Sequence, residues 1–389
     1  PFHAATLKAF AKEAPEKATQ LDAVLAEIDR QAIENFAVFE SKTMPGVSFS
    51  YSTLKITPDI IRQLSSTLRE RDTSDSGTTL PHAEEPEEAI AGSAKRRDYF
   101  LFTAFAFPPG GNAFGVQDVA IDRYIRLMPH VAHALRTGGI PPEITIHLLG
   151  APTGFGGSVT PEWIEQIKKS GLDGYGKLYA EYVQKSLPET HENRHVVLQG
   201  VSKGAIVAQK TSAALPEHLR KVTQRLLDNP AGEHKTGLIS SVVPGARVLK
   251  GMVQETASRM LRDDMMRTLM AEDLKFVEAL RAKKGMAKDS SVDAGRKRSA
   301  TWHEALTLLK GASLDTEKER SFIRRGINDP LTFSRERIND MEKKQADGNP
   351  LPFLKRDASV EIPFEGSHFF IYDRYKRWAQ ILDFVKATK

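Results

Sequence analysis

Nearly continuous apolar runs alternate along this chain with segments of helical periodicity. An apolar run without polar alternation, bounded by turn residues, predicts a strand that is covered on both faces. The strands predicted in this way, with weaker ones late in the chain, cover residues 99–107, 143–149, 195–201, 225–228, 331–334 and 358–364. Strands that alternate with helices at this spacing indicate an α/β fold with a mostly parallel, doubly wound sheet.

Helical spacing of apolar residues predicts the connections between these strands. Thr160-Pro161 is typical of a helix start, with threonine as the cap and proline in the first turn. The predicted helices cover about 118–137, 174–187, the stretch from the serine turn to 213, and 372–385. Glycine-rich segments follow several strands, and in parallel sheets these strand ends share the edge where ligands bind.

Three segments fall outside this alternation. Residues 1–42 have apolar residues at helical spacing, which predicts an N-terminal helix that packs on the sheet or forms a homodimer contact. Residues 47–54 alternate apolar and polar positions, which predicts an edge strand with one face in water. Residues 236–328 are helical in pattern and rich in charge and methionine, which predicts a cap inserted between core parts 43–235 and 329–389.

Composition narrows the class of protein. The 389 residues are 40% hydrophobic and 27% charged, and no run approaches the roughly 20 apolar residues of a membrane span. The lack of cysteine excludes disulfides, thiolate metal sites and a cysteine nucleophile, and it leads us to expect a cytoplasmic protein unless an N-terminal targeting segment was removed. A net charge of +5 is typical of a solvated surface, so no nucleic-acid partner is expected.

No metal or cofactor is expected from the motifs. His130 and His133 share a helix face, but no carboxylate stands at metal spacing beside them, which favours a packed or surface pair. Residues 154–157 lack the spacing of the dinucleotide fingerprint, and no Gly-Lys-Ser/Thr phosphate loop occurs.

The candidate chemistry is concentrated in Gly200-Val-Ser202-Lys-Gly204, a Gly-x-Ser-x-Gly motif between a predicted strand and a predicted helix. In that setting the serine occupies a tight, strained turn that lifts its hydroxyl above the sheet edge. Glycine is needed where strand and helix nearly touch, because a side chain would collide there. The alternative interpretation is an ordinary glycine-rich turn.

At this motif the chain resembles the α/β-hydrolase superfamily, over residues 98–235 and 329–389. The resemblance implies that Ser202 is a nucleophile and that His368, in Glu365-Gly-Ser-His368 after the last predicted strand, is its base. A serine hydroxyl is a poor nucleophile at neutral pH and needs such a base within hydrogen-bond reach. A histidine on a surface loop is the alternative interpretation of His368.

The resemblance also implies an acid that orients the histidine. Asp340 lies 28 residues before His368 and is the first choice, although no Gly-x-x-Asp signature follows the strand predicted at 331–334. Asp228 is the alternative, because it ends the strand after the serine strand. The other carboxylates that stay open are Asp329, Glu336 and Asp347.

An oxyanion hole requires two backbone N–H groups that face the developing negative oxygen. The resemblance implies that one belongs to Lys203, which follows the nucleophile, and the other to the loop after the first buried strand. That loop has two prolines at 108–109 where the family often has His-Gly, and prolines cannot donate. Gly110 or Gly111 is therefore expected to donate, with Asn112 as the alternative.

These residues together predict a serine hydrolase that cleaves a carboxylic ester, or an amide, through an acyl-enzyme intermediate. The expected partner is a small-molecule substrate with an apolar acyl part, because methionines like those of the insertion suit an adaptable apolar pocket. Packing between the helices of the insertion is the alternative interpretation of these methionines. An acyltransferase or a C–C bond hydrolase would use the same triad. A non-catalytic binding protein would keep only the fold.

Overall fold

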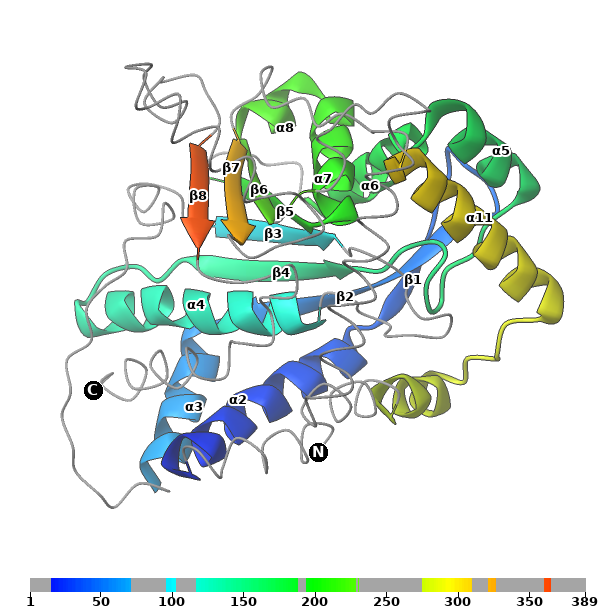
Figure 1. Ribbon diagram of the computed structural model, residues 1–389. Coiled ribbons are helices and arrows are strands. Elements are labelled where there is room, and N and C mark those ends of the chain that lie inside the picture. The colour runs from blue at the N-terminus through cyan, green and yellow to red at the C-terminus, as the bar shows by residue number, and fades with distance from the viewer. Residues whose placement is uncertain are drawn as a thin grey trace, which may run out of the picture.

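The computed structural model describes residues 15–70, 96–102, 117–187, 194–228, 230, 275–309, 321–326 and 360–364. Their strands form one sheet in the order β1-β2-β4-β3-β5-β6-β7-β8 (Figure 1). β2 runs antiparallel to both of its neighbours, and the other pairs are parallel. The strands are β1 Ala37–Glu40, β2 Ser48–Ile56, β3 Arg96–Phe102, β4 Glu143–Leu149, β5 Arg194–Val201, β6 Thr223–Asp228, β7 Ser321–Gly326 and β8 Val360–Phe364.

Helices cover both faces of this sheet, which confirms the predicted doubly wound architecture. In Figure 1, α2, α3 and α4 lie on one side and α5, α6, α7 and α11 on the other, each group with its own hydrophobic core. The helices are α2 Pro15–Glu34, α3 Pro58–Glu70, α4 Gln117–Arg136, α5 Pro161–Ser170, α6 Asp173–Ser186, α7 Lys203–Ala214, α8 Glu217–Lys221, α11 Ser291–Leu309 and a further helix at 275–284.

The central strands are apolar at successive positions because each faces two cores. In β3, Tyr99 and Leu101 pack into the core beneath α2, α3 and α4, whereas Phe100 and Phe102 pack into the core beneath α5, α6 and α7. The alternation of side chains along a strand makes this division unavoidable. The predicted start of α5 is also confirmed, because the Thr160 hydroxyl accepts a hydrogen bond from Trp163 N at 3.2 Å.

The N-terminal part of the sheet differs from the prediction in two ways. The segment 1–42 is not wholly helical, because β1 follows α2 and pairs with β2. β2 is not an edge strand with a wet face, since Ser50 and Ser52 are fully buried. Their hydroxyls donate to the carbonyls of Phe155 at 2.7 Å and Ala32 at 2.8 Å. Buried serines whose hydroxyls bind backbone carbonyls give the same alternation of apolar and polar residues as a strand with one face in water.

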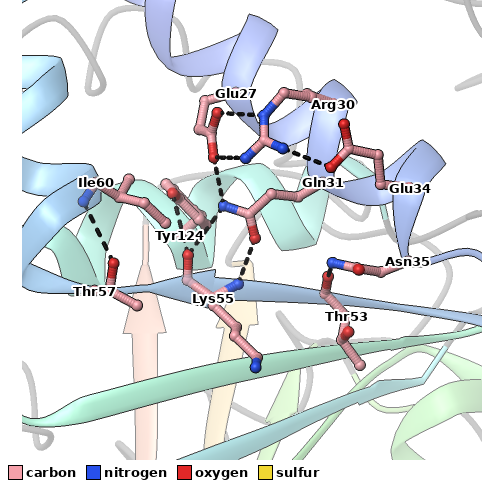
Figure 2. A network of polar contacts seen from close by, with 10 residues as sticks. All are labelled: Glu27, Arg30, Gln31, Glu34, Asn35, Thr53, Lys55, Thr57, Ile60 and Tyr124. Atoms are coloured by element: carbon pink, nitrogen blue, oxygen red, sulfur yellow. Dashed lines mark hydrogen bonds and ion pairs between the residues drawn. The ribbon is translucent and has the colours of Figure 1, made fainter.

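Figure 2 shows how α2 protects the part of β2 that extends beyond β1. The Gln31 amide accepts from Lys55 N at 2.6 Å and donates to Lys55 O at 3.1 Å, and Asn35 Nδ2 donates to Thr53 O at 2.8 Å. Glu27 Oε1 accepts from Gln31 Nε2 at 2.8 Å. Side chains of the helix thus replace a neighbouring strand on backbone groups that would otherwise form an open edge.

The C-terminal boundary of the insertion also changes. β7 lies within residues 236–328, which the sequence pattern assigned to the cap, yet it pairs with β6 and β8 inside the sheet. The insertion therefore ends before Ser321. The strand predicted at 331–334 and the helix predicted at 372–385 lie outside the described residues.

The buried His147 of β4 leads to a prediction about acid stability. Its ring stacks on Phe100 at a centroid distance of 4.3 Å, and Nδ1 lies 3.1 Å from the Tyr182 hydroxyl. Burial lowers the pKa of His147, although Asp98 acts in the opposite direction. In the unfolded chain His147 binds a proton below about pH 6.5, whereas in the folded chain its lowered pKa disfavours protonation. The free energy of unfolding therefore decreases as the pH is lowered through this window.

We therefore expect the free energy of unfolding of the wild-type protein to decrease, relative to that of His147→Phe, between pH 7 and pH 5. Urea denaturation of both proteins at each pH measures this difference. The other ten histidines are common to both proteins and cancel in the comparison. A difference that stays constant across the window would show that His147 protonates as readily in the folded chain as in the unfolded one.

Candidate active site

Ser202 lies at the junction between β5 and α7 and has a strained backbone. With φ 55° and ψ −117°, it has a positive φ that no other non-glycine residue shares in the described part of the chain. Such conformations cost about 1–3 kcal/mol and persist only where the surroundings impose them. Two hydrogen bonds hold the turn, from Ser202 N to Asp228 O at 2.9 Å and from Ala205 N to Ser202 O at 3.1 Å.

Gly200 allows the helix to approach the strand this closely. A Cβ atom at Gly200 would lie 2.1 Å from the carbonyl oxygen of Gly204 and 2.5 Å from Ala205 N. No side chain can occupy that space, so the predicted role of Gly200 is confirmed. The turn leaves Ser202 only 3% exposed, at the edge formed by the carboxyl ends of the parallel strands.

Asp228 lies beside this turn on the neighbouring strand. It ends β6, pairs in register with Val201, and is fully buried. Gln199 Nε2 donates to Asp228 Oδ2 at 2.7 Å, and Arg123 Nε of α4 donates to Gln199 Oε1 at 2.9 Å. A chain of polar contacts therefore runs from α4 through β5 to a carboxylate adjoining the serine turn.

Lys203 anchors the turn on the opposite face of the sheet. Its ammonium Nζ lies 2.5 Å from Glu304 Oε2 of α11, and Tyr175 donates its hydroxyl proton to Glu304 Oε1. Burial and the charge of Glu304 raise the pKa of Tyr175 well above its usual value, so this hydroxyl stays protonated. Because Lys203 begins α7, its backbone N–H lies at a helix N-terminus, where amides favour negative charge.

The remaining predicted site residues follow strands of the same edge. His368 comes four residues after β8 ends, and Gly110 and Gly111 come eight and nine residues after β3 ends. These three residues and Asp340 lie outside the described residues. The structure thus brings together Ser202, Lys203 and Asp228 from the predicted set. The placement of the others stays a prediction.

The position of β7 reveals a candidate acid that the sequence pattern ranked low. β7 ends at Gly326, so Gly326-Ile-Asn-Asp329 supplies the strand-then-Gly-x-x-Asp signature that is absent after the strand predicted at 331–334. The strand was missed because Arg324 and Arg325 interrupt its apolar run and resemble the charged insertion. The signature itself was the signal that could have located β7.

The described residues contain no group of three or more His, Asp or Glu side chains that could hold a metal ion. His130 and His133 accordingly have no third ligand within this part of the chain. Among the described helices, none combines the length and apolar character required to cross a membrane.

The strand order, the antiparallel β2 and the strained serine turn after β5 together define the α/β-hydrolase fold, and this chain has it. Neither a protein-family model nor a curated protein sequence matches the chain. Its fold is similar to that of a hydrolase from Pseudomonas aeruginosa, at 12% identity and a TM-score of 0.40, over 91% of this chain and 99% of that one.

Two further solved structures have comparable similarity. A peroxisomal α/β-hydrolase from Saccharomyces cerevisiae is 9% identical with a TM-score of 0.40, over 90% of this chain and 86% of its own. An α/β hydrolase from a deep-sea metagenome library is 10% identical with a TM-score of 0.39, over 91% and 98%. The assignment of the fold rests on the topology and the serine turn rather than on these values.

The contact at Gly200 predicts a large effect of a single methyl group. Gly200→Ala must push α7 away from β5, so we expect a loss of at least about 2 kcal/mol in the free energy of unfolding. Gly295→Ala is the matched control, because a Cβ there meets nothing within 4 Å inside α11. The control should be neutral or stabilising by up to about 1 kcal/mol. Equal stabilities of the two variants in chemical denaturation would contradict the close approach.

Proposed function

We propose that this protein is a serine hydrolase that cleaves a carboxylic ester, or an amide, through an acyl-enzyme intermediate. The observation that carries the proposal is the positive φ of Ser202 at the end of β5. A non-glycine residue is strained there, and strain of this kind is concentrated at functional sites. Glycine at position 202 would adopt the same backbone conformation without strain. The presence of serine there instead of glycine therefore indicates that its hydroxyl has a function.

The proposed reaction uses the residues along the carboxyl edge of the sheet. Ser202 Oγ attacks the carbonyl carbon while His368 accepts the hydroxyl proton. The N–H groups of Lys203 and of Gly110 or Gly111 stabilise the negative oxygen of the tetrahedral intermediate. The intermediate collapses, the leaving alcohol or amine takes the proton from the imidazole, and the acyl group stays on Ser202. Water, deprotonated by the same imidazole, then attacks the acyl carbon; the bond to Ser202 Oγ breaks, Ser202 Oγ takes the proton back from the imidazole, and the carboxylic acid leaves.

The five carboxylates that the sequence leaves open include three leading candidates for the role of the acid. Asp329 is favoured because it follows the end of β7 by three residues, at the strand next to the one that precedes His368. Asp340 follows the same strand end by fourteen residues. Asp228 is supported by its position beside the serine turn, but one of its oxygens already accepts from Gln199 on the face covered by α4.

The proposed substrate is a small molecule with an apolar acyl part. An acyltransferase or C–C bond hydrolase would share the same acyl-transfer residues and differ in the nucleophile or the bond broken. Product analysis in the presence of a competing alcohol or amine separates these reactions. A homodimer and a cytoplasmic location are further expectations of the sequence.

Replacement of the proposed nucleophile tests the reaction class. Ser202→Ala should abolish both ester turnover and labelling by a fluorophosphonate probe, because alanine offers no hydroxyl to be phosphonylated. Ser170→Ala, which removes an exposed hydroxyl in α5, should label like the wild-type protein. Labelling that persists in Ser202→Ala would remove the assignment. Absence of labelling in the wild-type protein would favour a non-catalytic binding protein.

Isosteric variants identify the acid. Asp329→Asn should lower kcat by about 10⁴-fold, since an asparagine favours the wrong histidine tautomer. Asp340→Asn should have little effect. Asp228→Asn retains an oxygen that can accept from Gln199, so it should fold normally and keep most of its activity. If Asp329→Asn has normal activity and either Asp228→Asn or Asp340→Asn lowers kcat by 10³-fold or more, the residue replaced in the impaired variant is the acid.

A further inference from the structure

A buried ion pair joins the insertion to the residue that follows the proposed nucleophile. The side chains of Lys203 and Glu304 are each 2% exposed, and their charged atoms lie 2.5 Å apart. Tyr175 of α6 satisfies the second carboxylate oxygen, and the Lys203 ammonium lies 5.4 Å from the centre of the Tyr175 ring. Both charges are therefore partnered within a predominantly apolar core.

Such a pair is a poor source of stability. Removing two charges from water has a large desolvation cost, and well-packed apolar residues of similar volume often stabilise a core equally well or better. The surroundings of this pair include Trp163, whose ring packs against that of Tyr175 at 5.0 Å, and Ala300 of the same core. Stability alone thus gives little reason to keep charges at these two positions.

The position of the Lys203–Glu304 pair beside the serine turn offers a functional reason for the two charges. Lys203 is the first residue of α7 and adjoins the strained Ser202, whereas Glu304 belongs to α11. α11 has a second attachment, because Lys297 Nζ donates to Gly154 O at 3.1 Å and pairs with Asp289 at 2.9 Å. The helix is thereby tied to the loop after β4 as well as to the serine turn.

We propose that Glu304 is a positioning residue, which fixes Lys203 and so holds the Lys203 N–H and the Ser202 hydroxyl in their reactive arrangement. The inference rests on the proposed function and extends it to the insertion. It means that the site is complete only when α11 is docked on the core. Because Glu304 acts through Lys203, its loss should affect the rate of acyl transfer more than the binding of substrate.

The test compares Glu304→Gln with Asp173→Asn in turnover of a short-chain p-nitrophenyl ester. Glu304→Gln removes the charge at nearly constant shape. Asp173→Asn removes the partner of Lys210, another lysine of α7, in a solvent-exposed pair of 2.8 Å. We expect Glu304→Gln to lower kcat by about 10- to 100-fold with KM within twofold of wild type, as for a misplacement of reacting groups. Asp173→Asn should leave both constants unchanged.

A double variant separates positioning from support of the fold. Lys203→Met combined with Glu304→Leu replaces the charges with apolar side chains, so its thermal stability should match or exceed that of Glu304→Gln. We expect its kcat to remain at least tenfold below wild type. A double variant with both wild-type kcat and high thermal stability would overturn the inference. A kcat within twofold of wild type in Glu304→Gln would also overturn it. If Glu304→Gln does not fold, the double variant decides.

The failure of this inference is distinguishable from the failure of the proposed function. A wild-type protein that neither turns over the ester nor reacts with a fluorophosphonate overturns both. A wild-type protein that reacts, together with an unimpaired Glu304→Gln variant, overturns the positioning role alone.

Discussion

The close approach of β5 and α7 at Gly200 is the constraint on which the site depends. The helix can begin directly after the strand only because no side chain stands between Gly200 and the carbonyl of Gly204. The abrupt reversal forces a positive φ on Ser202, and a backbone bond to Asp228 of the neighbouring strand fixes it. Strain at one residue is thus maintained by packing over two strands and a helix.

The serine turn is held by polar contacts from both faces of the sheet. On one face, Arg123 and Gln199 connect α4 to the carboxylate of Asp228. On the other, Lys203 reaches Glu304 of α11. These groups are buried, so each must be paired to avoid the cost of desolvation. Their pairing connects elements distant in the sequence to one backbone position, which accounts for a geometry that the turn would not keep alone.

Much of the core was predictable because it depends on local pattern. β4 and β5 are apolar runs that lie between two helical layers, and the Gly-x-Ser-x-Gly motif specifies its own turn. The predictions failed where polar residues are satisfied by tertiary contacts. Ser50 and Ser52 imitate a wet face, although carbonyls of other segments bind their hydroxyls. β7, with its two arginines, resembles the charged insertion, and for this reason the sequence pattern ranked Asp329 below Asp340 and Asp228 as the candidate acid.

Peptide mapping after reaction with a fluorophosphonate tests the central claim most directly, because a phosphonate adduct forms fastest on a hydroxyl that a base activates beside an oxyanion site. We expect one adduct, on Ser202, when the protein is digested and the modified peptide is sequenced by mass spectrometry. An adduct on a different residue, or a fully unmodified protein, would contradict it.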